Sequence, residues 1–505
     1  MKKQFLSLLL LLFVLLNSSS ALAKTLRVVL FGGPVPAIDS LAESFDPDSY
    51  SVITQIFDSL IHCDLDGNLQ AALATSWKMI DEATYEFCLR EGVTFHNGEK
   101  FDAEAVKFTY ETIIDPTFRA GNSWIFGTVK GVEIVEPYKI KIHLKQPDGM
   151  FLYRLTMFGS ICPPETIKTI GWEVFHEHPI GTGPYKLISW KKGKQITFEK
   201  NPDYWQEGLP KTDKLIFKVI PENHWAEALI NNEVDMVPNL SGKDTLKVKK
   251  AKNVSVVKRL VLQGYWVLLK NKGPLADVRV RRALNYAIDK QKLIKMGDFG
   301  NGEPLGGIGK KGELGYNPQV KPYFYDLDKA RQLLKEAGYS KGFTLKCLAA
   351  DLTEGVAKYI KGALKKIDVT VELEIVSRPQ WTQEVIVGKI KGTPYSGDMA
   401  INLVDNPIID VAFHMGLFLE SVSPWSFLDA PDFDGRYQAA LKIADLAEHE
   451  KALQKLDQYI HDQAFMIFTY QKIKTLGYRK NIKIPGVPIN GHINYNLLPL
   501  TEVEE

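Results

Sequence analysis

The hydrophobic and polar positions of this chain switch repeatedly between the period of a strand and the period of a helix. Residues 25–31 form a continuous apolar and β-branched run, which predicts a strand buried on both faces. Residues 132–144 alternate on either side of Pro137, which predicts a β-hairpin. Segments 102–114 and 278–296 instead place apolar residues three and four apart, which predicts two amphipathic helices.

The other predicted elements continue this mixture without a fixed repeat length. We expect strands at 59–64, 85–90, 214–220 and 369–375, and helices at 224–231, 326–337 and 449–460. Because strands and helices alternate irregularly, a repeat array is excluded. The pattern predicts a mixed fold, α/β or α+β, that contains several sheets.

The first 23 residues have a pattern of their own. Lys2 and Lys3 precede the apolar run 5–16, and the small residues Ala21 and Ala23 end the segment. This order is typical of a cleavable signal peptide, and the run is too short to span a bilayer. No cysteine lies near the expected cut, so the protein is not expected to be a lipoprotein. We expect a signal peptide at 1–23 and an exported mature chain that begins near Lys24.

Composition excludes several classes of protein. Hydrophobic residues make up 45% of the chain and charged residues 24%, which is too ordinary for a disordered protein. The chain has 62 Lys and Arg against 60 Asp and Glu, and the two leader lysines account for the excess. Nucleic-acid binding needs a basic surplus, so we expect no nucleic-acid partner.

Four cysteines enter the oxidising compartment that an exported protein meets, where disulfides persist: Cys63, Cys88, Cys162 and Cys347. Cys63 and Cys88 lie on neighbouring strand-like runs and can pair, but buried thiols are an equal alternative. Sequence alone does not choose among the possible pairings. The four are too dispersed for a zinc site.

Motifs of known chemistry give little support to an enzyme. The G-x-G-x-x-G at 307–312 has no strand before it and no helix after it, so we interpret it as a flexible loop. The His-Glu-His at 176–178 lacks a third ligand nearby and reads as a solvated turn. We therefore expect no catalytic residue, no metal and no cofactor. A secreted hydrolase is the alternative from another class, but no nucleophile–base motif supports it.

Four blocks, in order along the mature chain, carry a family resemblance. They are 69–108 (LQAALATSWKMIDEATYEFCLREGVTFHNGEKFDAEAVKF), 180–217 (IGTGPYKLISW, then NPDYW and KLIF), 275–289 (LADVRVRRAL, then YAID) and 325–338 (YDLDKA, then LL and EAG). Together they resemble the extracytoplasmic solute-binding proteins of peptide and nickel ABC transporters. This group includes the oligopeptide- and dipeptide-binding proteins.

The resemblance implies a periplasmic-binding-protein-like fold with three lobes, in which two main lobes enclose a ligand cleft and a third is inserted. The implied division is lobe I at 24–58, 180–265 and 477–505, lobe II at 59–179, and lobe III at 266–476. Two crossing strands near 265–271 and 467–473 would join the main lobes and act as their hinge.

The resemblance also implies a function. A periplasmic, monomeric protein would capture a short peptide between its lobes and deliver it to an ABC permease, with its ATPase, in the inner membrane. The alternative within the same fold is a nickel chelate or another small polar solute, and His62 or His414 would then reach the site.

Site residues follow from the resemblance more sparsely. Peptide-binding relatives pair an Asp in a W-x-x-D segment with the ligand's α-ammonium; here Asp405 takes that position and Asn402 stands where the Trp would be. From local sequence alone, Asp405 is equally well a turn-capping residue before Asn406 and Pro407. Four aromatic residues match the cleft or flank the hinge, although such residues are more often core: Trp381, Tyr265, Trp266 and Tyr470.

One departure concerns the other end of a ligand. Dipeptide-binding relatives hold the ligand's carboxylate with an Arg before a helix, where this chain has the acidic segment 350–354. Lys389 and Lys391 are the available substitutes, or the ligand has no carboxylate there. Longer peptides and cationic solutes therefore stay open.

Overall fold

The computed structural model describes residues 23–30, 35, 38, 41, 47–118, 120–492, 494 and 496–504. The expected signal peptide, apart from Ala23, lies outside the described residues, as does most of 31–46. Within the described ranges, no helix has the length and apolar character needed to cross a membrane.

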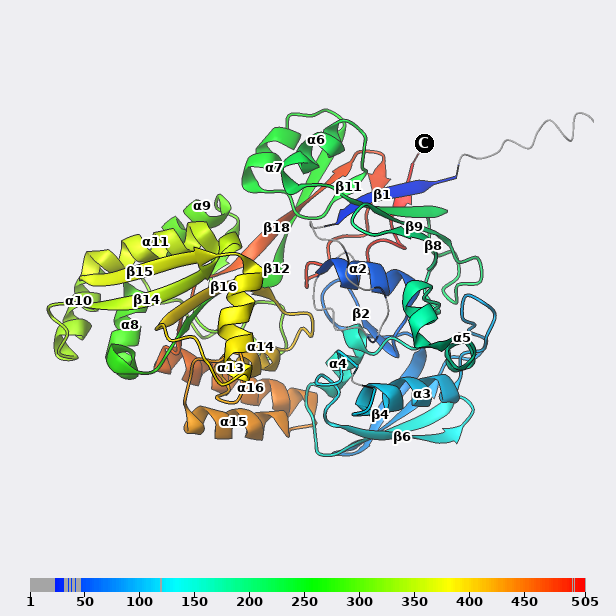
Figure 1. Ribbon diagram of the computed structural model, residues 1–505, viewed down its shortest axis with the longest axis horizontal. Helices are drawn as coiled ribbons and strands as arrows, with labels where there is room; N and C mark the ends of the chain where they lie inside the picture. The colour runs from blue at the N-terminus through cyan, green and yellow to red at the C-terminus, as the bar shows by residue number, and fades with distance from the viewer. Residues whose placement is uncertain are drawn as a thin grey trace, which may run out of the picture.

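A large mixed sheet runs through the whole molecule and forms its frame (Figure 1). Its strand order is β15-β14-β16-β12-β18-β11-β1-β10-β9-β8, with β13 paired to β18 and β17 paired to β12. The bounds are β1 (Thr25–Leu30), β8 (Tyr185–Lys191), β9 (Gln195–Lys200), β10 (Lys214–Val219), β11 (Met236–Val237), β12 (Val254–Leu269), β13 (Gly302–Pro304), β14 (Phe343–Ala350), β15 (Val369–Val376), β16 (Met399–Asp405), β17 (Met466–Ile467) and β18 (Tyr470–Arg479).

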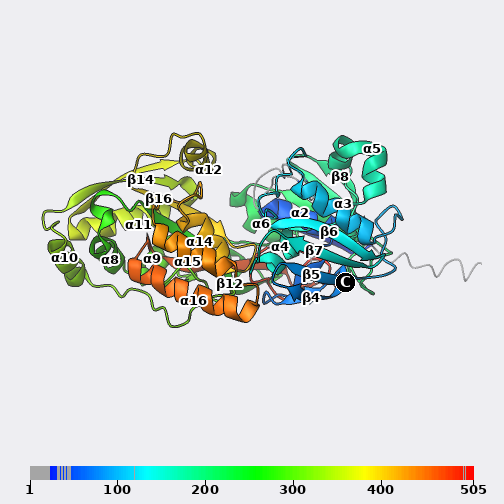
Figure 2. The same ribbon diagram turned by 90° about the horizontal axis from the view of Figure 1, so that it is seen from below.

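Two strands connect the two bodies that Figures 1 and 2 show on the left and right. β12 and β18 pair antiparallel from Val254↔Arg479 to Gly264↔Gln471, and the register shifts between Leu260 and Gly264. β12 then continues beside β16, so one strand takes part in both bodies. The predicted crossing segments overlap these strands, whereas the predicted lobe boundaries stay a prediction.

The right-hand body contains the first strand of the chain. β1 pairs parallel with β10 and with β11, whereas β9 pairs antiparallel with both β8 and β10. Helices α2 (Pro47–Ile56), α6 (Trp225–Ile230) and α7 (Gly242–Val248) lie in this body (Figure 1). Leu26, Val28 and Leu30 are fully buried, as the apolar run at 25–31 predicted.

A separate antiparallel sheet, in the order β4-β5-β7-β6, forms the lower right of Figure 1. Its elements and the small strands and helices beside it are β2 (Ile61–Cys63), β3 (Leu69–Ala71), β4 (Ala74–Asp81), β5 (Thr84–Leu89), β6 (Val129–Glu136), β7 (Lys139–Leu144), α3 (Ala103–Ile114), α4 (Phe151–Phe158) and α5 (Pro164–Glu177). The hairpin predicted at 132–144 is confirmed by β6 and β7. Asp102 caps α3 by accepting from the backbone N–H of Glu104, as its position predicted.

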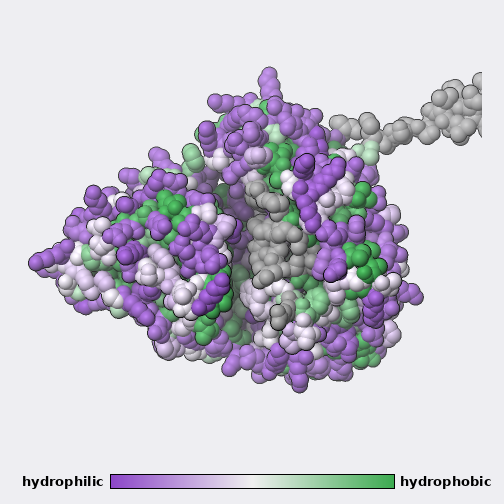
Figure 3. Space-filling model, in the orientation of Figure 1, coloured by the Kyte–Doolittle hydropathy of each residue, from purple (hydrophilic) through white to green (hydrophobic). Residues whose placement is uncertain are grey.

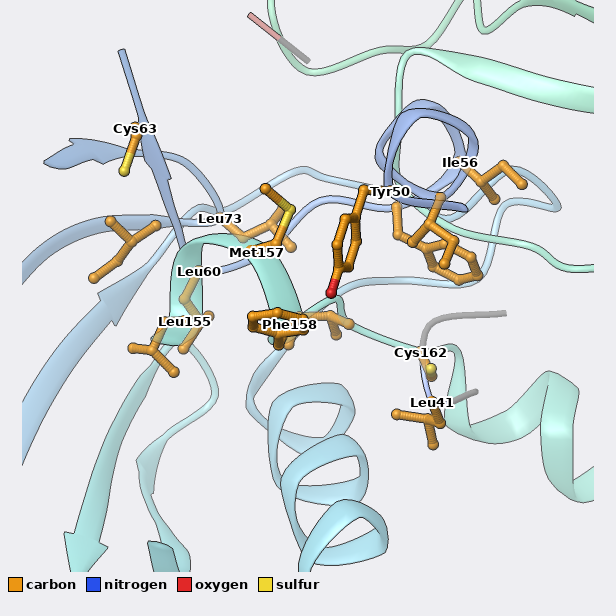
Figure 4. Packing of buried hydrophobic residues seen from close by; sticks show 14 of the residues in the cluster. Leu41, Tyr50, Ile56, Leu60, Cys63, Leu73, Leu155, Met157, Phe158 and Cys162 are labelled. Carbon is orange, nitrogen blue, oxygen red and sulfur yellow. The ribbon is translucent and has the colours of Figure 1, made fainter. Parts of the chain in front are cut away.

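The core beneath this sheet joins it to the rest of the right-hand body. Tyr50 of α2 points its ring towards Phe158 of α4, and the ring centroids are 5.4 Å apart in an edge-to-face arrangement (Figure 4). Leu60, Leu73 and Leu155 pack in the same cluster. The same continuous core thus supports α2 and the small sheet.

Helices cover the left-hand body. They are α8 (Val278–Tyr286), α9 (Lys290–Asp298), α10 (Leu327–Glu336), α11 (Glu354–Leu364), α12 (Arg378–Thr382), α13 (Gly388–Ile390), α14 (Val411–Leu419), α15 (Pro431–Leu441) and α16 (Leu446–Gln463). The single helix predicted at 278–296 was wrong, because Asp289 accepts from the backbone N–H of Lys292 and caps a second helix there. Short strands at Ile482–Lys483 (β19) and Glu502–Val503 (β20) complete the fold.

Three local predictions are settled by these elements. All four cysteines are thiols; β2, which holds Cys63, pairs with β3 rather than with β5. His176 and Glu177 are the last residues of helix α5, and His178 is its C-terminal cap. The solvated turn predicted at 176–178 was therefore wrong, because the segment is a helix end. The glycine-rich loop 307–312 does follow a short strand, β13, and its Gly307 lies against the carboxylate of Asp457, where a Cβ would come within 2.3 Å of Oδ1.

Candidate functional site

A deep groove separates the left-hand body from the rest of the molecule in the space-filling view (Figure 3). The hinge strands β12 and β18 join the two bodies, and β16 runs antiparallel to β12 with Asp405 opposite Gln263. Because β16 ends at Asp405, the sheet itself places this side chain at the junction of the two bodies. The polar side chains around Asp405 therefore define the candidate site.

Asp405 faces two basic side chains from the C-terminal part of the chain. Its Oδ2 lies 2.7 Å from Nε2 of His492, and the two side chains are 17% and 0% exposed. Lys474 of β18 is buried beside them, and its Nζ donates to the carbonyl oxygen of Gly491 at 3.4 Å. The cluster Asp405–His492–Lys474, which we call the carboxylate cluster, joins β16, β18 and the segment after β19.

Electrostatics keep the carboxylate ionised. Burial would raise the pKa of Asp405, but the charges of His492 and Lys474 outweigh burial and hold that pKa well below its usual range. Burial lowers the pKa of Lys474 to about 8, although Asp405 opposes this shift. An ionised, partly exposed carboxylate at the junction of the two bodies is suited to bind a cation.

A second buried network lies directly behind Asp405. Lys310 Nζ donates to Glu313 Oε1 at 2.7 Å, and both side chains are 0% exposed. The amide of Asn406 also donates to Glu313 Oε1, at 2.8 Å, and to the carbonyl oxygen of Asp410. We call Lys310, Glu313, Asn406 and His414 the anchor network, because it fixes the chain on both sides of the loop after β16.

His414 completes the anchor network as a neutral imidazole. Its Nε2 donates to the carbonyl oxygen of Asp405 at 3.0 Å, so its Nδ1 carries a lone pair and accepts from Lys310 Nζ at 2.8 Å. Burial lowers the pKa of His414 well below its ordinary value, and the neighbouring ammonium of Lys310 lowers it further. Both ring nitrogens are in use, so the structure does not support the predicted role of His414 at a metal-chelate site.

Trp266, which lies inside the predicted hinge segment 265–271, pairs with Asn402 across β12 and β16. The ring of Trp266 lies 4.7 Å from Lys310 Nζ, and its centroid lies 5.1 Å from that of His414 in a tilted arrangement. Its indole N–H has no hydrogen-bond partner among the described residues. Asn402 is 2% exposed. These two predicted site residues thus border the anchor network.

Tyr265 and Tyr470 lie side by side on the hinge strands, with ring centroids 5.1 Å apart. The Tyr470 hydroxyl donates to Asp298 at 2.7 Å, and Lys472 Nζ lies 3.0 Å from the same carboxylate and donates to the Tyr265 hydroxyl. Burial alone would lower the pKa of Lys472, but Tyr265 and Asp298 outweigh it and raise that pKa. Both tyrosines therefore brace the hinge against α9, and a ligand contact for either stays a prediction.

Trp381 lies on α12 and Lys389 on α13. Trp381 is fully buried beside Trp425, 5.7 Å between centroids, in a cluster of its own with Leu348 and Val385. Lys389 Nζ donates to the carbonyl oxygens of Ser421, Ser423 and Ser426. The interpretation of Lys389 as a substitute for the missing Arg is therefore wrong, because its donors already hold the 421–426 loop, while a ligand contact for Trp381 stays a prediction.

Sequence reasoning found Asp405 but missed most of its partners. Lys472 and Lys474 stand two apart on a strand that is otherwise apolar or uncharged at most positions, which indicates buried cations on one face of that strand. His492 gives no comparable signal, since nothing near it in the sequence marks it as the neighbour of a residue 87 positions earlier.

Two bodies joined by paired hinge strands, with a polar groove between them, define a binding protein that closes around a solute. Residues 68–397 match the model of the family described as bacterial extracellular solute-binding proteins, family 5. The chain belongs to this family. It is therefore a solute-binding protein of an ABC importer, and its family is a transport class.

The chain is similar to individual proteins in sequence and in fold. The glutathione-binding protein GsiB of Salmonella paratyphi A is 29% identical over 372 residues, 72% of each chain. The structure is similar to the periplasmic binding protein DppA from Helicobacter pylori in complex with the peptide STSA, with a TM-score of 0.80 and 26% identity over 96% of this chain and 99% of that one. It also resembles NikZ from Campylobacter jejuni in complex with Ni(L-His), with a TM-score of 0.77 and 24% identity over 92% and 95%.

Proposed function

We propose that this protein captures a short peptide through the peptide's free α-ammonium group and that Asp405 binds this group. The observation that carries the proposal is an ionised carboxylate at the junction of the two bodies, 17% exposed and held by buried neighbours. A carboxylate and an ammonium form charge-assisted hydrogen bonds, which are about twice as strong as neutral ones. The peptide ligand of the Helicobacter pylori relative and the name of the Salmonella relative support this ligand class.

The carboxyl end of the ligand is not held by an Arg, as it is in dipeptide-binding relatives. Segment 350–354 is acidic, and Lys389 is bound to three carbonyl oxygens, so of the predicted substitutes for the Arg only the exposed Lys391 is left. The site therefore favours ligands that extend beyond two residues, with recognition concentrated at the amino end. Backbone hydrogen bonds and bridging waters would hold the remaining residues without strong sequence preference.

Capture and delivery follow from the hinge. Only the closed state lets a ligand contact both bodies, so binding shifts the population towards that state. An affinity near micromolar, about 8 kcal/mol, allows both capture and release. The proposal includes export by a cleavable signal peptide to the periplasm, action as a monomer with the predicted lobes, and delivery to a permease driven by its ATPase, without any bond-making step.

A nickel chelate or another small polar solute is the alternative. The likeness to the Campylobacter jejuni protein supports the fold, but His414 uses both ring nitrogens inside the anchor network. His62 is buried 3.5 Å from Asp58, and burial lowers its pKa to about 3. Metal analysis of the protein after mild purification separates this alternative from the peptide.

Calorimetric titration with a free-amine tripeptide and with its N-acetylated counterpart tests the proposal. We expect saturable binding of the free-amine peptide and loss of that binding on acetylation, because acetylation removes the charge that Asp405 binds. Equal binding of both peptides, or of neither across a varied set, would contradict the proposal.

A further inference from the structure

The glycine-rich loop encloses a buried carboxylate that the proposed function does not use. Asp457 of α16 is 1% exposed. A Cβ on Gly307 would come within 2.3 Å of its Oδ1, and a Cβ on Gly309 within 3.0 Å of its Oδ2. Glycine lets a backbone approach another group this closely, because it has no side chain of its own. Gly307 and Gly309 of the sequence motif therefore allow the loop to wrap around Asp457.

The carboxylate of Asp457 is bonded at one oxygen. Its Oδ1 accepts from the N–H groups of Ile308 at 2.8 Å and Gly309 at 3.3 Å, whereas no described residue donates a hydrogen bond to Oδ2. Lys310 acts on this charge, but its Nζ is bound to Glu313. Burial raises the pKa of Asp457 to about 7, because these interactions do not offset burial. Oδ2 is therefore able to accept a further hydrogen bond.

A cavity of about 190 Å³ lies between this carboxylate, the glycine-rich loop and residues 316–322. Asp457 lines the cavity, and its Oδ2 is not sealed from solvent. The three residues of the carboxylate cluster do not line it, so it is distinct from the proposed peptide site. Because pockets for drug-sized ligands measure about 300–1,000 Å³, this cavity suits a smaller solute. We call it the loop cavity; its charged lining residues are Glu303, Lys311, Lys321 and Asp457.

The charges of the loop cavity favour a cation that carries N–H groups. Burial raises the pKa of Tyr316, and the carboxylates of Glu303 and Asp457 raise it further, so both act on the same wall. Of the two lysines, Lys321 donates its Nζ to a carbonyl oxygen of its own loop at 2.6 Å, and Lys311 is exposed. The described part of the chain holds no group of three or more His, Cys, Asp or Glu side chains suited to a metal ion. An ammonium group fits instead, because it donates hydrogen bonds as well as carrying charge.

We propose that the loop cavity is a second binding site, which takes the primary ammonium group of a small solute on Asp457 Oδ2. The ammonium donates a charge-assisted hydrogen bond to this oxygen, and Glu303 adds a second negative charge to the same cavity. Two kinds of small solute carry this group: an alkylammonium ion, and a free amino acid whose carboxylate would meet Lys311. The site does not involve Asp405, so the inference goes beyond the proposed peptide function and does not depend on it.

Ligand-detected NMR titration of the full chain tests the inference. The probes are ethylammonium and glycine at about pH 8, where Asp457 is ionised because its pKa is about 7. Wild type and Asp405→Asn are titrated in parallel, since Asp405 also attracts an ammonium group. We expect saturable binding of at least one probe in both proteins, and at least about tenfold weaker binding of tetramethylammonium, which has the charge but no N–H donor. Tighter binding of glycine than of ethylammonium would identify a free amino acid as the solute, and the reverse order an alkylammonium ion.

Variants assign the binding to the loop cavity. Asp457→Asn should weaken it at least about tenfold, because the amide has no charge and its oxygen is held by the loop N–H groups. Glu303→Gln, at an exposed position, should weaken it roughly threefold and decides the question if Asp457→Asn folds poorly. Asp328→Asn, on a side chain 98% exposed, is the matched control and should change nothing.

Three results would overturn the inference. They are the absence of saturable binding in Asp405→Asn, equal binding of tetramethylammonium, and binding that neither Asp457→Asn nor Glu303→Gln weakens. None of these results bears on peptide binding at Asp405, which the N-acetylated peptide tests separately.

Discussion

The anchor network and the carboxylate cluster lie on either side of the same loop, yet they differ in how completely they are bonded. In the anchor network, Lys310 Nζ makes directed hydrogen bonds to Glu313 Oε1 and to His414 Nδ1 and lies over the Trp266 ring. In the carboxylate cluster, Asp405 and His492 are equally close but make no directed hydrogen bond with each other.

The difference separates stability from recognition. A buried charged group whose hydrogen bonds are all made has no free donor or acceptor for a ligand. Removing one residue of such a network leaves the charges of its partners uncompensated. A buried charged group with unsatisfied hydrogen-bonding atoms lowers the stability of the fold, but these atoms remain available to a ligand. We therefore expect changes to the anchor network to act on folding, and changes to the carboxylate cluster to act on binding.

The largest effect is expected from Glu313→Ala. Lys310 would keep its charge in the interior without a carboxylate, which costs about 3–5 kcal/mol of the free energy of unfolding. Glu448→Ala is the matched control, because Glu448 and Lys451 have the same three-residue spacing but side chains 63% and 62% exposed. That exposed pair should contribute at most about 1 kcal/mol. Thermal and denaturant unfolding measure both; equal losses would erase the contrast between buried and exposed pairs.

Asp405→Asn should reverse this pattern. Loss of the carboxylate removes the partner of the ligand ammonium, and we expect affinity to fall by about 2 kcal/mol or more, roughly 30-fold. The unfolding free energy should change less than in Glu313→Ala. Asp328→Asn, on a side chain 98% exposed, controls for the substitution itself. A variant that binds normally but unfolds easily would place Asp405 with the anchor network.

Asp457 is a third buried carboxyl group, and here burial outweighs the hydrogen bonds that the group accepts. Its Oδ1 accepts from the N–H groups of Ile308 and Gly309, but burial raises its pKa to about 7 because these bonds do not compensate fully. The folded pKa lies above the unfolded value, so stability falls as pH rises between about 4 and 7. Asp457→Asn keeps a hydrogen-bond acceptor at this place and should remove the dependence of stability on pH between these values. The substitution should therefore stabilise the protein by on the order of 2 kcal/mol at neutral pH. Melting temperatures across this range measure it; parallel curves would refute it.

The smallest effect is expected at the hinge. Tyr470→Phe removes the hydroxyl that donates to Asp298, while Lys472 still pairs with that carboxylate. We expect a loss of about 1 kcal/mol in unfolding free energy and little change in affinity. A large loss of affinity in this variant would instead show that the hydroxyl contacts ligand or controls closure.

Sequence patterns predicted the elements well wherever one local cause dominates. Apolar runs predicted β1, and Asp102 predicted the start of α3. The apolar spacing continues across Asp289, so the sequence pattern hides the break between α8 and α9 that this cap makes. The lesson is that a periodic pattern sets the buried face of a segment but not its continuity.

The site was less predictable because it is assembled from distant segments. Asp405 was found through its place in a family motif, whereas His492 meets it only through the folded path of the C-terminal segment. Lys389 was chosen for its charge, yet three carbonyl oxygens of the 421–426 loop claim its donors. Charge in a sequence does not reveal which partner will neutralise it.

A double-mutant cycle across protein and ligand tests the central claim most directly. Wild type and Asp405→Asn are each titrated with the free-amine tripeptide and its N-acetylated form, and the four binding free energies give one coupling energy. The account predicts a coupling of about 2 kcal/mol, because the carboxylate and the ammonium matter only to each other. Additive effects, with a coupling below about 0.5 kcal/mol, would contradict it.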